Sequence, residues 1–287
     1  MDNAINPASG TVEKGNPRIA AVGDNCVDVY VGDRDGRFPG GNALNVAVLA
    51  AGEGADAAYA GSVGDDADGM ALIAAAAAAG VDVSMVERLP GRTGVTTVRL
   101  TDGEREFVAE QYGVSLSFDL DEACVAWLRG FDWIHSARIA DPDGRLSALA
   151  RAGMPVSRDF GTELRDGAPA ASAVGHLAIA FFSAADRGEA ERRADELVAL
   201  GARSAIGMIG SQGAILRSAG LALHEPAVAI DPVDTLGAGD AFIAAYVTGA
   251  LRGEKAEDAL RAAAAAAART CARLGAWGAL ETTEVGR

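Results

Sequence analysis

The stretch DTLGAGD, residues 234–240, places two glycines around an alanine and ends on Asp240, directly before the apolar run AFIAAYVTGAL. Glycine lets the backbone approach another group closely. The N-terminus of a helix presents unpaired N–H groups at the positive end of the helix dipole. We therefore predict that the N–H groups of Gly237, Ala238 and Gly239 bind an anion at the start of a helix, and phosphate is the best candidate.

Asp240 would repel a static phosphate, so its presence beside this turn needs another reason. Phosphoryl transfer requires a base that takes the proton from the attacking hydroxyl, and a carboxylate can serve as that base. The alternative is a glycine-rich turn in which the aspartate only begins a helix. The stretch is not a Walker A loop, because GxxxxGK[ST] does not occur in the chain. It is not a dinucleotide fingerprint either, because Phe242 stands where GxGxxG needs glycine.

The bulk composition narrows the class of protein. The 287 residues are 49% hydrophobic and 5% aromatic, which fits one large α/β domain with a core mostly of Ala, Val, Leu and Ile. The net charge of −15 disfavours binding to nucleic acid or to an acidic membrane. Three widely spaced cysteines favour a reducing cytoplasm over a disulfide framework or a structural zinc site. We expect neither a secretory signal nor a membrane span.

Strand and helix patterns alternate from Arg18 onward, after a polar segment over 1–17 that is expected to be a disordered tail. Such alternation is typical of βαβ units and of a mostly parallel sheet covered on both faces. The segment 93–112 differs, because it contains two strand patterns joined by Asp102 and Gly103, a hairpin signal. With VDVYVGDRDGRF it is expected to form a small sheet that covers a site at the C-terminal edge of the parallel strands.

Two further motifs carry polar groups suited to a polyhydroxylated ligand. In GDNCVD, an apolar strand leads into Asp24, Asn25 and Asp28, whose hydrogen-bonding groups would lie at a sheet edge. In GGNALN, Asn42 and Asn45 are three residues apart on one side of a helix start, where amides can bind hydroxyls without adding charge. Turn formation by Asp24 and Asn25 and helix capping by Asn42 are the alternatives.

In order and spacing, the three motifs resemble the ribokinase-type (PfkB) carbohydrate kinase family. PGGNALNVAVLAAGEG (39–54) is similar to its first signature, DTLGAGDAF to its second, and GSVGDDADG to the segment before its second helix. The likeness extends over about residues 18–278. It implies a ribokinase-like three-layer α/β/α sandwich with a mostly parallel central sheet, as a kinase domain over 18–287. It also implies a small β lid at about 28–38 and 93–112, through which a homodimer is expected.

The resemblance implies ATP-dependent phosphorylation of a sugar-like hydroxyl, with Mg²⁺ held largely by phosphates and water. Asp240 would be the base, and Gly237, Ala238 and Gly239 would form the anion hole for the transferring phosphoryl group. The expected substrate ligands are Asp28, Asn25, Gly40, Gly41, Asn42, Asn45 and, at the end of a strand, Arg138. The expected nucleotide ligands are Thr235, Gly210 and Gly213.

Within the family, GDNCVD and GAW (275–277) are most similar to members that phosphorylate fructoselysine. We therefore expect a fructosamine substrate and a 6-phosphate product. A family kinase for ribose, fructose, ketodeoxygluconate or adenosine is the nearest alternative. A non-catalytic sugar or nucleotide sensor is another, and a nicotinamide-dependent oxidoreductase is disfavoured by the missing GxGxxG.

Two segments depart from the family pattern. SAAD (183–186) stands where the family often has Asn-x-x-Glu, which affects the expected magnesium-water network. Met208 stands where the nucleotide loop often carries threonine, which affects one phosphate contact. The acidic residues Asp65, Asp66 and Asp68 lack the spacing of a calcium loop, so we expect turn and capping roles for them rather than a metal site.

Overall fold

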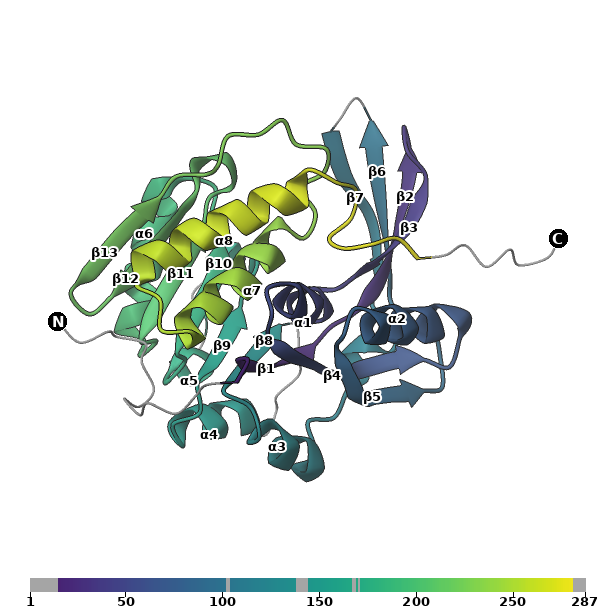
Figure 1. Cartoon of the computed structure of the whole chain (residues 1–287), viewed down its shortest axis with the longest axis horizontal. Coiled ribbons are helices and arrows are strands. Elements are labelled where there is room, and N and C mark those ends of the chain that lie inside the picture. The colour runs from purple at the N-terminus through teal and green to yellow at the C-terminus, as the bar shows by residue number, and fades with distance from the viewer. Residues whose placement is uncertain (1–14, 102–103, 138–143, 167–168, 170, 281–287) are drawn as a thin grey trace.

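Two β-sheets of unequal size organise the chain in the computed structural model, which describes residues 15–101, 104–137, 144–166, 169 and 171–280 (Figure 1). Most of the expected tail over 1–17 therefore lies outside the described residues. The larger sheet has nine strands in the order β13-β12-β11-β10-β9-β8-β1-β4-β5. In chain order they are β1 (Arg18–Gly23), β4 (Asp56–Gly64), β5 (Asp82–Leu89), β8 (Trp133–Ala137), β9 (Val156–Asp159), β10 (Ile179–Ser183), β11 (Ser204–Met208), β12 (Ala214–Ser218) and β13 (Leu221–Glu225).

The larger sheet is parallel from β5 to β11, and at its other edge β12 pairs antiparallel with both β11 and β13. The central strand β1 shows why it is covered on both faces. Ile19 and Ala21 pack into one core cluster, whereas Ala20 and Val22 pack into the other, and all four are fully buried. A strand that is apolar on both faces is typical of a parallel sheet between two helical layers.

Helices form these two layers (Figure 1). The first core cluster includes residues of α1 (Asn42–Gly52), α2 (Ala67–Ala78), α7 (Ala238–Leu251) and α8 (Ala256–Cys271). The second includes residues of α3 (Glu122–Leu128), α4 (Arg145–Arg151), α5 (Ala171–Val174) and α6 (Arg187–Ala199). The expected three-layer α/β/α sandwich with a mostly parallel sheet is confirmed. Among the helices in the described part of the chain, none combines the length and apolar character that a bilayer crossing requires.

A second sheet of four strands, in the order β3-β2-β6-β7, stands at one end of the larger sheet (Figure 1). Its strands are β2 (Cys26–Gly32), β3 (Gly36–Gly40), β6 (Val95–Thr101) and β7 (Glu104–Gln111). The expected hairpin is present as the antiparallel pair β6–β7, although Asp102 and Gly103 lie outside the described residues. β2 pairs with both β3 and β6, so the two segments expected to lie apart from the main body form one sheet.

Candidate active site

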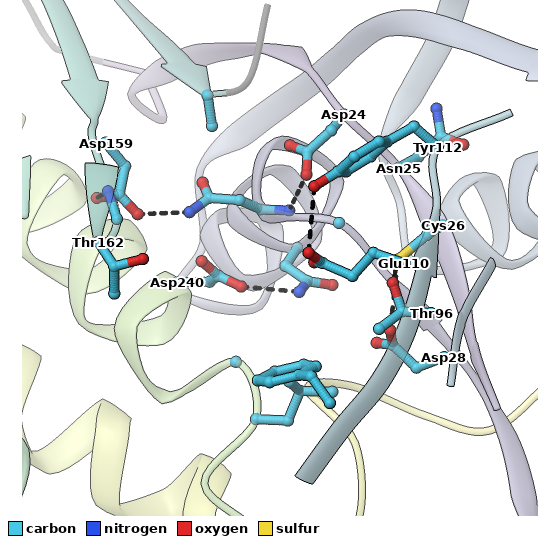
Figure 2. A pocket seen from close by; sticks show the side chains of 18 of the residues that line it. Asp24, Asn25, Cys26, Asp28, Thr96, Glu110, Tyr112, Asp159, Thr162 and Asp240 are labelled. Carbon is cyan, nitrogen blue, oxygen red and sulfur yellow. Dashed lines mark hydrogen bonds between the residues drawn. The ribbon is translucent and has the colours of Figure 1, made fainter. Parts of the chain in front are cut away.

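One cavity of about 180 Å³ lies where β1, β8 and β9 end, with β6 and β7 of the small sheet on its other side (Figure 2). Residues after β1, the first turns of α1 and α7, and the segment after β9 also line it. Parallel strands end at the same edge of a sheet, so polar residues that are far apart in the sequence meet at this place.

The turn before α7 needs glycine at position 237 for two reasons. Gly237 has a φ of 76° and is the N-cap residue of α7, a left-handed conformation that favours glycine. A Cβ on this residue would also lie 2.3 Å from the Cβ of Ala276. Ala238 and Gly239 then begin the helix, so their N–H groups belong to the first turn, which has no intrahelical partners for them.

Asp240 lies in the first turn of α7 and is only 9% exposed. Its Oδ2 accepts a hydrogen bond of 2.7 Å from Nδ2 of Asn45, which lies in the first turn of α1. Burial raises the pKa of the Asp240 carboxyl well above its ordinary value; the hydrogen bond from Asn45 opposes this, and the negative charges of Asp159, Asp24 and Asp28 add to it. The carboxyl therefore takes up a proton more readily than a solvated aspartate does.

Asn45 has a second buried partner. Its Oδ1 accepts a hydrogen bond of 2.8 Å from Nε1 of Trp277, in the segment after α8. Trp277 is similarly buried, at 8% exposure. Sequence reasoning placed Asn45 among the sugar ligands and did not connect it with Trp277; the structure joins the two residues, which are 232 positions apart.

Asn42 does not cap α1, so this alternative is wrong. Its Nδ2 donates to Asp159 and its Oδ1 faces Nε2 of His135 at 3.3 Å. The start of α1 is held by Asp24 instead, whose two carboxylate oxygens accept from the N–H groups of Asn42 and Ala43 at 3.3 and 3.2 Å. Asn42 therefore keeps its side chain at the cavity, because Asp24, in the connection between β1 and β2, serves the helix terminus.

His135 orients the Asn42 amide through a buried chain of hydrogen bonds. Nδ1 of His135 lies 3.0 Å from Oγ of Ser157, and this Oγ also accepts a hydrogen bond of 2.8 Å from Nε1 of Trp133. Because the amide nitrogen of Asn42 donates to Asp159, its Oδ1 faces His135 as an acceptor, so the proton of the neutral ring lies on Nε2 and Nδ1 accepts from the Ser157 hydroxyl. Burial lowers the pKa of His135 to about 3, so the ring is neutral at physiological pH.

Asn25 lines the cavity, but its amide nitrogen is directed at the larger sheet. Nδ2 donates to the hydroxyl of Tyr59 at 2.9 Å and to the carbonyl of Ser62 at 2.7 Å. The residue is 1% exposed, so it fixes the chain where β1 passes into β2. Its expected role toward a substrate stays a prediction.

The two glycines before α1 make room for these side chains. A Cβ on Gly40 would lie 2.0 Å from Oδ2 of Asp28, and a Cβ on Gly41 would lie 2.3 Å from Cα of Asn25. Asp28 is 4% exposed and accepts a hydrogen bond of 3.3 Å from the thiol of Cys26. The glycines therefore let β3 and α1 approach the acidic residues that line the cavity.

The residues expected to bind nucleotide are not among those that line this cavity. Thr235 is exposed, and Gly210 and Gly213 lie in the β11–β12 connection with φ of 54° and 96°. A Cβ on Gly213 would lie 2.0 Å from the carbonyl oxygen of Glu225. The sulfur of Met208 would lie 3.6 Å from a Cβ placed on Gly239. Met208, which departs from the family pattern, therefore packs beside the turn over residues 237–239, called the anion turn below.

The other departing or unplaced residues are accounted for as follows. Asp186 caps α6, because its carboxylate accepts from the N–H of Glu189 at 2.8 Å. Asp66 caps α2 and also accepts from the N–H and hydroxyl of Thr93, which agrees with the expected capping role. Arg138, expected as a substrate ligand, lies outside the described residues.

Carboxylates are the charged side chains among the described residues that line the cavity. Figure 2 shows Asp159 and Asp240 near one side of it, and Glu110 from β7 and Tyr112 from the residue after β7 reaching toward it. Among the lining residues that the structure describes there is no lysine and no arginine. The six lining carboxylates are Asp24, Asp28, Glu110, Asp159, Glu163 and Asp240.

Sequence reasoning missed Asp159 and Glu110. Asp159 ends β9, and an acidic residue at the end of an apolar strand is a usable signal. Glu110 lies on β7 with its carboxylate 3.2 Å from the hydroxyl of Tyr112. Its position at the cavity could not be read from the sequence. The alternation of side chains along a strand tells which residues share a face of the sheet, but not what that face covers.

Comparison with known proteins agrees with this geometry. Residues 19–152 and 173–283 match the family described as pfkB family carbohydrate kinase. Fructosamine kinase FrlD of Bacillus subtilis is 36% identical, with 91% of this chain and 93% of that protein covered. Fructoselysine 6-kinase of Escherichia coli is 35% identical, with 90% and 99% covered.

Solved structures share the fold. Arabidopsis thaliana ribokinase complexed with ribose and ATP has a TM-score of 0.78 at 22% identity, with 91% of this chain and 94% of that chain covered. Thermotoga maritima ribokinase has a TM-score of 0.77 at 21% identity, with the same shares covered. The expected ribokinase-like architecture is confirmed.

Proposed function

We propose that this chain, which belongs to the pfkB family of carbohydrate kinases and is an ATP-dependent sugar kinase, acts on a fructosamine. The proposed reaction converts fructoselysine to fructoselysine 6-phosphate. The relatives named for fructosamine and fructoselysine support this choice, since the similarity extends over most of both chains. The acidic cavity supplies an independent physical reason.

The acidic lining of the cavity is the observation that carries the substrate class. A fructosamine bears an amine that is protonated at neutral pH, so six carboxylates attract it more strongly than they attract fructose or ribose. Ketodeoxygluconate is an anion, and the same carboxylates would repel it. The described lining residues include no lysine or arginine, so Arg138 is the one cation among the expected substrate ligands, against six carboxylates.

In the proposed reaction, the 6-hydroxyl oxygen attacks the γ-phosphorus of ATP, the bond from this phosphorus to the bridging oxygen breaks, and ADP leaves. Asp240 accepts the proton of the hydroxyl, and its raised pKa makes this carboxylate a stronger base than a solvated aspartate. The N–H groups of Gly237, Ala238 and Gly239 stabilise the charge on the transferring group. When bound with ATP, Mg²⁺ neutralises phosphate charge, held largely by phosphates and water.

The turn before α7 fits a phosphoryl group, because it begins a helix and carries no side chain at Gly237 or Gly239. The remaining roles are assigned by family pattern and by position. We assign the substrate to Asp28, Asn25, Gly40, Gly41, Asn42, Asn45 and Arg138, and the nucleotide to Thr235, Gly210 and Gly213. Most of the substrate set lines the cavity, which supports the first assignment.

The small sheet would act as a lid over the substrate, formed by the segments at about 28–38 and 93–112 of a kinase domain over 18–287. Residues of β6 and β7 line the cavity, which supports this role. Phe107 and Val108 on β7 are 52% and 42% exposed, which supports a homodimer through the lid. The three cysteines are free thiols, which supports our proposal that the protein works in a reducing cytoplasm.

Magnesium-dependent ATP consumption with a panel of acceptors tests the proposal. The panel contains fructoselysine, a second fructosamine, fructose, ribose, ketodeoxygluconate and adenosine, and the position of the phosphate is read from the product by NMR. We expect the highest kcat/KM with fructosamines and phosphate on the 6-oxygen. A higher kcat/KM with a plain sugar or a nucleoside would leave the kinase assignment in place and overturn the substrate.

A further inference from the structure

Trp277 reaches Asp240 through a single side chain. Its Nε1 donates to Oδ1 of Asn45 at 2.8 Å, and Nδ2 of the same amide donates to Oδ2 of Asp240 at 2.7 Å. All three side chains are at least nine-tenths buried. An indole N–H can only donate, so the amide oxygen must face Trp277 and the amide NH₂ must face Asp240.

We propose that Trp277 is a positioning residue for phosphoryl transfer, which holds the Asn45 amide with its donor end toward Asp240. The inference rests on the proposed function, in which Asp240 is the base. Without the indole N–H, the amide can rotate by half a turn and present its oxygen to Asp240. An oxygen in that place stabilises the protonated carboxyl, which cannot accept the proton of the attacking hydroxyl.

The charges around Asp240 make this orientation consequential. Burial and neighbouring carboxylates favour the protonated form of Asp240, and the hydrogen bond from Asn45 favours the charged form. Among the described residues, the carboxylates that raise the pKa of Asp240 or share its cavity are Asp24 after β1, Asp28 on β2, Glu110 on β7, Asp159 at the end of β9 and Glu163 beyond it, and the cavity is also lined by the thiol of Cys26 and the phenol of Tyr112. Each of these carboxylates is acidic, and negative charge nearby raises the pKa of Asp240. Reversal of the Asn45 amide would remove the hydrogen bond that opposes this rise.

The segment that carries Trp277 is fixed against the anion turn. The N–H of Gly275 donates to Oδ2 of Asp234 at 2.9 Å, and Oδ1 of Asp234 accepts from the N–H of Leu236 at 3.0 Å. Ala276 packs so closely against Gly237 that no Cβ fits there. The backbone therefore holds Trp277 in a defined position relative to both the turn and Asn45.

Packing alone is the competing explanation, and Trp277→Phe separates the two. Phenylalanine keeps most of the buried ring and removes only the N–H donor. With MgATP and the panel acceptor that the wild-type enzyme phosphorylates fastest, we expect kcat to fall about tenfold, the usual size for loss of one buried hydrogen bond. The acidic limb of the kcat–pH profile should move to higher pH. KM for ATP should not change, because the nucleotide loop is not involved.

Trp127→Phe is the matched control, since Trp127 lies partly buried in α3 and far from the cavity lining. It should leave kcat and the acidic limb as in wild type. If folded Trp277→Phe had the same kcat as the wild type and the same acidic limb of the kcat–pH profile, the inference would be overturned. If Asp240→Asn kept full turnover, the proposed base would fail instead, so the two failures are distinguishable.

A measurement on the wild-type protein covers the case in which Trp277→Phe does not fold. The indole ¹⁵N–¹H signals can be assigned with Trp127→Phe and Trp133→Phe, because the chain has three tryptophans. We expect the Trp277 signal to titrate with the midpoint of the acidic limb of kcat, while the Trp127 signal does not. A Trp277 signal that stays constant through that midpoint would overturn the inference.

Discussion

The side-chain amide of Asn45 donates a hydrogen bond of 2.7 Å to the carboxylate of Asp240, which joins residues 195 positions apart in the sequence. Asn45 lies in the first turn of α1 and Asp240 in the first turn of α7, and the two helices share one core cluster. The two glycine-rich turns of the chain therefore meet at one cavity. The proposed chemistry depends on this meeting, because one turn would hold the sugar and the other the transferring phosphoryl group.

Asp240→Asn should keep ATP binding and lower kcat by about 10²–10⁴-fold, since an amide cannot accept the hydroxyl proton. Steady-state kinetics and calorimetric titration with ATP measure the two properties. Asp195→Asn is the control, because Asp195 is an exposed aspartate on α6. Near-normal turnover of Asp240→Asn would remove Asp240 from the proposed role.

Gly237→Ala should cost both stability and turnover. The left-handed backbone costs about 1–2 kcal/mol for any residue with a Cβ, and the new methyl group would collide with Ala276. Gly253→Ala is a matched control, since Gly253 has a φ of 82° and no atom within 4 Å of its Cβ position. Urea unfolding should show a lower free energy of unfolding in both variants than in the wild type, with the larger decrease in Gly237→Ala. Equal kcat values in the two variants would contradict the role of the turn.

Glu110→Gln should weaken the binding of fructosamines selectively. The partly solvated carboxylate of Glu110 would no longer attract the protonated amine, so KM for fructoselysine should rise about 3- to 10-fold. KM for fructose should stay unchanged, because fructose has no amine. Glu106→Gln on the same strand is the control, since Glu106 pairs with Arg99 on the exposed part of β7. A parallel rise in KM for both acceptors would show that Glu110 does not recognise the amine.

His135 should make the fold sensitive to acid. Its pKa of about 3 in the folded chain lies below the ordinary value of about 6.5, so the unfolded chain binds a proton first as the pH falls. The stability contributed by the neutral ring is complete above about pH 6.5 and is lost as the pH falls toward 3. Between pH 7 and 5, the free energy of unfolding measured in urea should fall by about 2 kcal/mol more in the wild type than in His135→Gln. Equal losses would exclude His135 as the cause.

The sequence predicted much of the fold, because its motifs act locally. Glycine at position 237 and the carboxylate three residues later are readable from one short turn, and the hairpin of β6 and β7 was expected from its strand pattern. The strand β5 was not expected, since its residues are mostly half-buried or exposed at the sheet edge and give no strong apolar signal.

The contacts that complete the site were not readable from the sequence. The indole of Trp277 meets Asn45 across 232 positions, and Asn42 meets Asp159 across 117. Such pairs depend on which strands and helices become neighbours, whereas a local pattern reports only how one element packs. For the same reason, helix capping by Asn42 was a reasonable alternative until the structure placed Asp24 at that helix start.

The measurement that tests the substrate proposal most directly compares fructoselysine with an analogue acylated at the amine that joins the sugar to lysine. The two acceptors share the hydroxyl that is phosphorylated and differ in the positive charge on this nitrogen. With MgATP, we predict that kcat/KM is at least tenfold higher for fructoselysine, because the acidic cavity attracts the protonated amine. Equal kcat/KM for the two acceptors, or a preference for the acylated one, would contradict recognition of the amine by the cavity.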